Sequence, residues 1–165
     1  MPKTFNDPLF PSQWYLLNTG QRGGGTSRLD INVMSAWDRY SGKGVIVAVN
    51  DDGMDLTHPS LVANLLTNLT YDTARGTTGK GFEGTDNSHG TVVGSIVGMA
   101  GNDGIGGVGV AYGAKIVAGV AIGKGLNYAN VALANLAAGA SVSVNSWGAD
   151  PAFSENFGSG GGESD

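Results

Sequence analysis

Short apolar segments alternate along this chain with segments in which apolar residues recur at helical spacing. Three segments predict strands: residues 45–50, 115–122 and 141–146. Residues 90–99 predict a helix, because apolar residues recur there three and four positions apart, and residues 127–138 predict a second helix that Asn127 caps. Because strands and helices alternate, the sequence predicts an α/β fold with a parallel sheet.

Polar residues stand at the ends of two predicted strands. Asp51 directly follows the β-branched run of the first strand, and Asn145 and Ser146 end the last. The carboxyl ends of parallel strands meet at one edge of the sheet, where ligands bind in such folds. We therefore expect Asp51 and Ser146 to face the same rim.

A histidine, His89, stands immediately before the first predicted helix. An aspartate that orients an imidazole and a histidine that moves a proton are two of the three members of a Ser-His-Asp triad. The other histidine of the chain, His58, precedes Pro59 in a predicted loop. His89 is therefore the candidate general base, and Asp51 is its candidate partner.

Composition narrows the classes of function. A hydrophobic content of 41% is enough for a core, and the formal net charge of −5 argues against a nucleic-acid partner. No apolar run reaches the roughly 20 residues that a membrane span needs. The absence of cysteine excludes disulfides and thiolate metal sites. We expect residues 1–5 to be flexible or cloning-derived and the glycine-rich residues 158–165 to be a flexible end.

Several motifs follow one another in the order in which one protease family carries them. They are Asp7–Leu16, Gly42–Gly53, His89–Thr91, Gly107–Tyr112 and Asn145–Gly148. On these motifs the chain resembles the kexin and furin branch of the subtilisin-like serine proteases, from about Asn6 to Trp147. The resemblance implies a subtilisin-like three-layer sandwich with a parallel sheet, of which residues 1–165 form the amino-terminal part of the catalytic domain.

The resemblance implies that Asp51 and His89 are catalytic, because aspartate before histidine is the subtilisin order. No serine after His89 lies in a Gly-Thr-Ser-Met-Ala type of context, and the family's oxyanion asparagine is also expected on a later segment. We therefore expect the Asp and His half of a serine endopeptidase, inactive alone. The alternative is a catalytically dead peptide-binding or scaffold module with the same fold.

Four residues are implied to bind substrate: Asp52, Ser146, Trp147 and Gly148. In furin-like enzymes an acid at the position of Asp52 favours a basic residue beside the scissile bond. The segment Ser146–Gly148 corresponds to one that pairs with extended substrate through backbone hydrogen bonds. Polypeptides are therefore the expected substrates.

A structural calcium ion is also implied by the resemblance. The expected ligands are the side chains of Asp7 and Asp103 and the carbonyl groups of Ala100, Ile105 and Gly107. Hard oxygen ligands on a sharply turning, glycine-rich loop suit Ca²⁺. Ser60 departs from the pattern, because furin-like enzymes have an aspartate there.

The expected partner is a serine-bearing carboxyl-terminal half of the catalytic domain or a second copy of the chain. A cleavage product, a truncated gene product and a non-enzymatic descendant all fit this arrangement. By resemblance the protein is expected to be secreted or to belong to the cell envelope, although no signal peptide precedes Asn6.

Overall fold

The computed structural model describes residues 3–21, 25–73, 75–78, 88–122 and 127–148. In chain order their elements are η1 (Phe10–Ser12), α1 (Val33–Ala36), β1 (Ile46–Asp51), η2 (Thr67–Leu69), β2 (Tyr71–Asp72), β3 (Thr77–Thr78), α2 (Ser88–Gly98), β4 (Lys115–Val120), α3 (Tyr128–Ala137) and β5 (Val142–Val144). The elements η1 and η2 are short 3₁₀ helices. The expected flexible end at residues 158–165 lies outside the described residues.

The strands form one sheet in the order β3-β2-β4-β1-β5. All neighbouring pairs are parallel except β2 and β3, which are antiparallel. The predicted α/β fold is confirmed, and both predicted helices form, with the Asn127 side chain accepting a hydrogen bond from the Ala129 N–H at 2.9 Å. Strands β2 and β3 were not predicted, because two residues are too few to show an alternating pattern.

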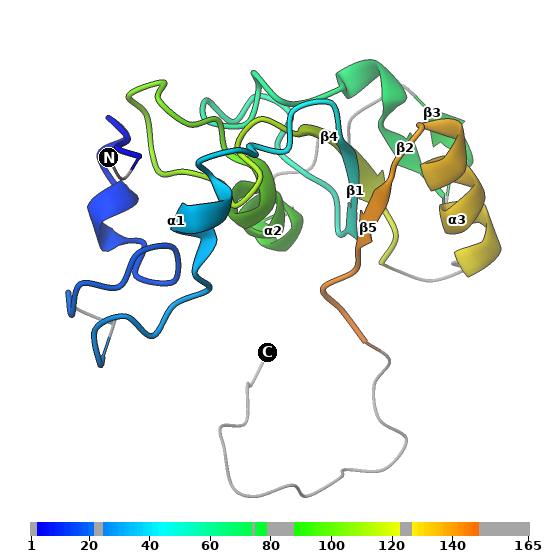
Figure 1. Ribbon diagram of the computed structural model, residues 1–165. Coiled ribbons are helices and arrows are strands. Elements are labelled where there is room, and N and C mark those ends of the chain that lie inside the picture. Colours follow the sequence, from blue (N-terminus) through cyan, green and yellow to red (C-terminus); the bar gives the residue numbers. More distant parts are fainter. Residues whose placement is uncertain (1–2, 22–24, 74, 79–87, 123–126, 149–165) are drawn as a thin grey trace, which may run out of the picture.

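The two longer helices lie on opposite sides of the sheet (Figure 1). On the α2 side, Val49 of β1 and Ile116 of β4 are buried, and Val93 and Val97 of α2 pack against their cluster. Successive side chains of a strand point to opposite faces. Asp51, two residues after Val49, therefore belongs to the face that α2 covers.

A smaller apolar cluster lies on the α3 side of the sheet. Tyr71 of β2, Val117 of β4 and Ala138 at the end of α3 are buried together, and Ala134 packs against them. This face holds the side chain of Asn50, the neighbour of Asp51 on β1, which the Tyr71 hydroxyl reaches. One strand thus sends adjacent polar side chains into two separate environments.

The amino-terminal segment packs as a group of aromatic rings. Phe5 lies 5.0 Å from both Phe10 and Trp37, measured between ring centroids, and 5.2 Å from Tyr112. Lys3, also within the segment expected to be flexible, forms a hydrogen bond with the Tyr112 hydroxyl. The Trp37 indole N–H donates to the Val110 carbonyl at 2.8 Å. These contacts attach the first described residues to the loop that follows α2.

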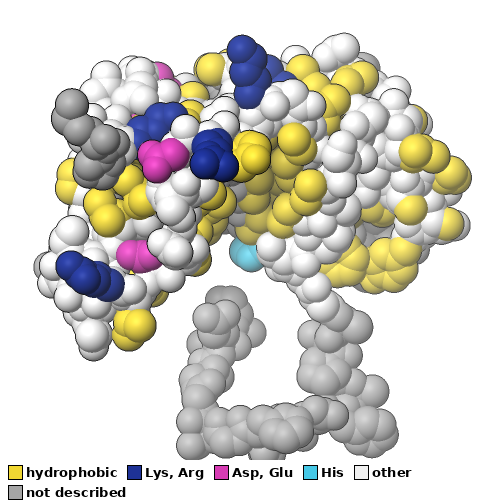
Figure 2. Space-filling view, viewed as in Figure 1, with side chains coloured by type: hydrophobic (Ala, Val, Ile, Leu, Met, Phe, Trp, Pro, Cys, Tyr) yellow, Lys and Arg dark blue, Asp and Glu magenta, His cyan; other side chains and the backbone are white. Residues whose placement is uncertain are grey.

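Hydrophobic side chains also reach the surface in the space-filling view (Figure 2). Exposed examples are Val92 and Ile96 of α2 and Leu133 and Leu136 of α3. None of the described helices combines the length and the apolarity needed to cross a bilayer.

Gly119 leaves room for the Tyr71 side chain to lie over β4 on one face of the sheet. The register aligns Tyr71 of β2, Gly119 of β4 and Asn50 of β1 in one row. The Tyr71 ring crosses over Gly119, where an added Cβ would lie 2.4 Å from the ring, and its hydroxyl forms hydrogen bonds with Asn50 and Asn135. Burial raises the pKa of Tyr71. The phenol therefore stays protonated and able to donate at neutral pH.

Gly119→Ala is expected to lower the free energy of unfolding by about 1–3 kcal/mol, the usual cost of overpacking a core. The physical cause is displacement of the Tyr71 ring, which would also break the contact with Asn50. The measurement is urea unfolding followed by fluorescence. Gly148→Ala is the matched control, because an added Cβ there has nothing within 4 Å. Equal stability of the two variants would contradict the proposed crowding.

Candidate active site

Asp51 ends β1 with its side chain fully buried. Its Oδ1 lies 2.7 Å from Nδ1 of His89 and also accepts the N–H of Asp52 at 2.8 Å. An ionised carboxylate can only accept hydrogen bonds. Nδ1 of His89 therefore carries the proton in this contact, and Nε2 is the nitrogen left to act as a base.

His89 is the second residue of α2, and 56% of its side chain is exposed to solvent. The hydrogen bond to Asp51 and the negative charge of Asp51 raise the pKa of His89, burial lowers it, and the charge of Asp52 raises it by a smaller amount. A buried acceptor thus holds one edge of the imidazole while much of the ring remains accessible. This is the arrangement of a general base that takes a proton from a second reactant.

The start of α2 packs closely against the segment that leaves β1. The N–H of Gly90 donates to Oδ1 of Asp52 at 2.7 Å, and the N–H of Asp55 donates to the hydroxyl of Thr91 at 2.9 Å. A Cβ added at Gly90 would lie only 2.0 Å from the carbonyl oxygen of Gly53. Only glycine therefore fits at position 90, between His89 and Thr91 of this chain.

The segment Ser146–Gly148 runs past the end of β1. Pairing between β1 and β5 ends at Val144 rather than at the predicted Ser146, and the Trp147 indole N–H binds the carbonyl of Asn50 at 2.6 Å. Trp147 also stacks on Tyr128, with centroids 5.4 Å apart and planes at 16°. Ser146 and Gly148 are exposed. The structure therefore places this segment beside the strand end that carries Asp51.

Asn50 is a site-supporting residue that sequence reasoning missed. It is completely buried, and its Nδ2 donates to Oγ of Ser143 at 2.9 Å and to Oδ1 of Asn145 at 3.0 Å. These bonds join the ends of β1 and β5 through side chains. The available signal was an amide at the end of an otherwise apolar strand, since buried polar groups need partners.

The predicted calcium ligands lie together in part. Asp7 is buried, and its carboxylate accepts the N–H groups of Asn102 at 2.8 Å and Asp103 at 3.3 Å. Burial raises the pKa of Asp103, and the nearby Asp7 raises it further, against the opposing effect of the Ile105 N–H. The oxygen chemistry and the two adjacent acids fit a calcium ion, whose charge would relieve their repulsion.

The other predicted ligands of the calcium ion are backbone carbonyl groups of this loop. Ser60 Oγ lies 3.5 Å from the carbonyl oxygen of Ile105, one of the predicted ligands. Across the part of the chain that the structure describes, no group of three or more His, Cys, Asp and Glu side chains is arranged to hold a metal. A calcium site here would therefore depend on backbone carbonyls such as those of Ala100 and Gly107.

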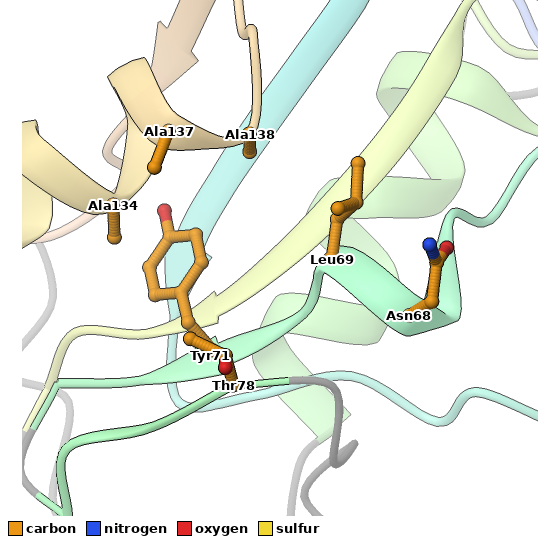
Figure 3. A pocket seen from close by; sticks show the side chains of 7 residues that line it. All are labelled: Asn68, Leu69, Tyr71, Thr78, Ala134, Ala137 and Ala138. Atoms are coloured by element: carbon orange, nitrogen blue, oxygen red, sulfur yellow. The ribbon is translucent and has the colours of Figure 1, made fainter.

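A cavity of about 210 Å³ lies away from these residues, on the α3 face of the sheet. Figure 3 shows its lining, with the ring of Tyr71 directed toward Ala134 and Ala137 of α3 and with Thr78 of β3 nearby. Ligand pockets usually occupy about 300–1,000 Å³. The cavity is smaller than that, and neither Asp51 nor His89 lines it.

Comparison with known proteins identifies the family. The model of the subtilase family matches residues 42–164. The chain belongs to the subtilase family. Neuroendocrine convertase 2 of Bos taurus is 49% identical over 115 residues, which are 67% of this chain and 18% of that protein. The Drosophila melanogaster protein of the same name is 48% identical over 114 residues, 67% of this chain and 17% of the relative.

Solved subtilases share the fold as well. The serine protease of Aeromonas sobria superposes with a TM-score of 0.69 at 30% identity, covering 80% of this subtilase chain and 23% of that structure. A protease of Pseudoalteromonas arctica gives a TM-score of 0.62 at 32% identity, covering 85% and 46%. The predicted family is confirmed, and similarity to the convertases agrees with the predicted kexin and furin resemblance. The chain spans about 18% of the length of the curated relatives it matches.

The pKa of His89 is expected to lie above the ordinary histidine value of about 6.5. The pair with Asp51 stabilises the fold while His89 is protonated, and this contribution is lost as pH rises through the raised folded-state pKa. Ring NMR signals followed against pH give the midpoint. Asp51→Asn is expected to lower it, whereas the control Asp55→Asn, on the same loop, is expected to leave it in place. A wild-type midpoint at or below 6.5 would contradict the Asp51 contact.

Proposed function

We propose that this subtilase chain is the Asp- and His-bearing part of a serine endopeptidase. The observation that carries the proposal is the 2.7 Å contact between a fully buried Asp51 and an accessible His89. A nucleophilic serine and an oxyanion asparagine would come from a further segment of polypeptide. The short span of this chain on its relatives supports that division.

The proposed reaction assigns one proton transfer to each step. Asp51 holds the proton on Nδ1 of His89, and Nε2 takes the proton of the serine hydroxyl as its oxygen attacks the peptide carbonyl. The resulting imidazolium is stabilised by the Asp51 carboxylate and then gives the proton to the leaving amine as the peptide C–N bond breaks, which leaves the acyl group on the serine oxygen. Water then attacks the acyl-enzyme: Nε2 of His89 takes a proton from the water and returns it to the serine oxygen as the ester bond breaks, which releases the second product.

Substrate binding is proposed to use the segment after β5. Extended polypeptide would pair with the backbone of Ser146 and Gly148, which are both exposed. The hydrogen bond of Trp147 to the Asn50 carbonyl and its stacking on the Tyr128 ring would hold this segment in place before substrate arrives. Asp52 is proposed to favour a basic residue beside the scissile bond, since it is only partly buried.

The proposed partner is the serine-bearing carboxyl-terminal half, with a second copy of the chain as the other candidate. β5 has one neighbour in the described sheet, and Val142 on it is 46% exposed. An open strand edge next to an exposed apolar side chain favours addition of another strand. We also propose that the complete protein is secreted or belongs to the cell envelope.

In the complete protease, His89→Ala is expected to lower kcat by about 10⁶, because base and nucleophile act in one step. Asp51→Asn is expected to cost about 10⁴, because the imidazole is then held in the wrong tautomer. Peptide hydrolysis and labelling by a fluorophosphonate are the measurements, with His58→Ala as the control that retains activity. Chain 1–165 alone is expected to be inactive and unlabelled.

Two results would contradict the proposed catalysis. Wild-type activity in His89→Ala would remove His89 from the mechanism. A complete protein that binds peptides without cleaving them would favour the alternative function, a peptide-binding or scaffold module.

A structural calcium ion is proposed for the loop around Asp7 and Asp103. Calcium at about 100 times its dissociation constant is expected to stabilise the folded chain by about 2.7 kcal/mol. Thermal melts with calcium and with a chelator measure this. Asp103→Ala is expected to abolish most of the shift, while the control Asp30→Ala, in another loop, should keep it. Melts that are identical with calcium and with chelator would refute the site.

A further inference from the structure

The carboxylate of Asp52 is bound by the backbone of a helix. Gly90, the third residue of α2, donates its N–H to Oδ1 of Asp52 at 2.7 Å. The first four N–H groups of a helix have no acceptor within the helix, so this group needs one from outside. A carboxylate is the strongest such acceptor, and its charge is favourable at a helix N-terminus.

The packing around Gly90 leaves little room for the N–H of Gly90 to move relative to Asp52. The carbonyl oxygen of Gly53 would lie 2.0 Å from a Cβ at position 90, so two backbones meet there without an intervening side chain. Asp52 Oδ1 would lie 2.8 Å from the same Cβ. The helix therefore contacts Asp52 and Gly53 one residue after His89, where a small shift of the backbone moves the imidazole by a similar amount.

We propose that Asp52 is a positioning residue for His89. It binds the start of α2 to the end of β1 and thereby keeps Nδ1 of His89 within hydrogen-bond distance of Asp51. The inference rests on the proposed function, in which that distance matters for proton transfer. Two adjacent carboxylates thus have separate tasks: Asp51 binds the ring, and Asp52 binds the backbone beside it.

This task is distinct from selection of a basic substrate residue. Selection requires the negative charge of Asp52, whereas positioning requires an oxygen acceptor at Oδ1. Asp52→Asn keeps an acceptor of the same shape and removes the charge. Asp52→Ala removes both. The two variants therefore separate the roles when they are compared on peptides that differ only in a neutral or basic residue beside the scissile bond.

In the complete protease, Asp52→Ala is expected to lower kcat about tenfold or more on both peptides, with little change in KM for the neutral one. Asp52→Asn is expected to have a kcat on the neutral peptide closer to that of the wild type than to that of Asp52→Ala. Its preference for the basic peptide over the neutral one is expected to be weaker than that of the wild type. Wild-type kcat for Asp52→Ala on the neutral peptide would overturn the proposal. Equal losses in the two variants would overturn it as well.

A second measurement is independent of catalysis. In the complete protease, amide hydrogen exchange at Gly90 is expected to speed up in Asp52→Ala but not in Asp52→Asn or in the control Asp55→Ala. Unchanged exchange at Gly90 in Asp52→Ala would refute the positioning bond whatever the activity. An inactive wild-type protein with the expected exchange pattern would instead refute the proposed function and keep the bond.

Discussion

The close approach of α2 to the end of β1 is the constraint on which the candidate site depends. Gly90 lies against the carbonyl of Gly53, and no larger residue fits between the helix and the loop. This contact brings the start of a helix to the end of a strand that is 38 positions earlier in the chain. The Asp51 and His89 side chains then meet at 2.7 Å.

The sheet supports this meeting by dividing polar side chains between its two faces. Asp51 points toward α2, while Asn50 points toward α3 and binds Ser143 and Asn145. Both side chains are buried, and burial of a polar group is tolerated when hydrogen bonds replace those to water. Oδ1 of Asp51 accepts from His89 and from the Asp52 N–H, whereas Oδ2 of Asp51 has no hydrogen-bond partner among the described residues. On the α3 side, the Tyr71 ring lies over Gly119 and its hydroxyl forms a hydrogen bond with Asn50. The end of β1 is thus fixed from both faces.

The contact between Asp51 and His89 in this subtilase could be predicted from the sequence. The positions of Asp51 and His89 follow from a strand end and a helix start, and both are visible as local patterns in the sequence. The pairing of Trp147 with the Asn50 carbonyl, and its stacking on Tyr128, could not be predicted in this way. Those contacts join residues far apart in the chain, and no spacing rule connects them.

By itself the sequence predicted the α/β class, both longer helices with the Asn127 cap, and the pairing of Asp51 with His89. Periodicity and capping act over a few residues, so they can be recognised without a structure. Only the tertiary structure decided where β5 ends, which face Asn50 occupies and that Asp52 binds Gly90. These features depend on which segments of the chain pack against one another, and that depends on the packing of the whole chain.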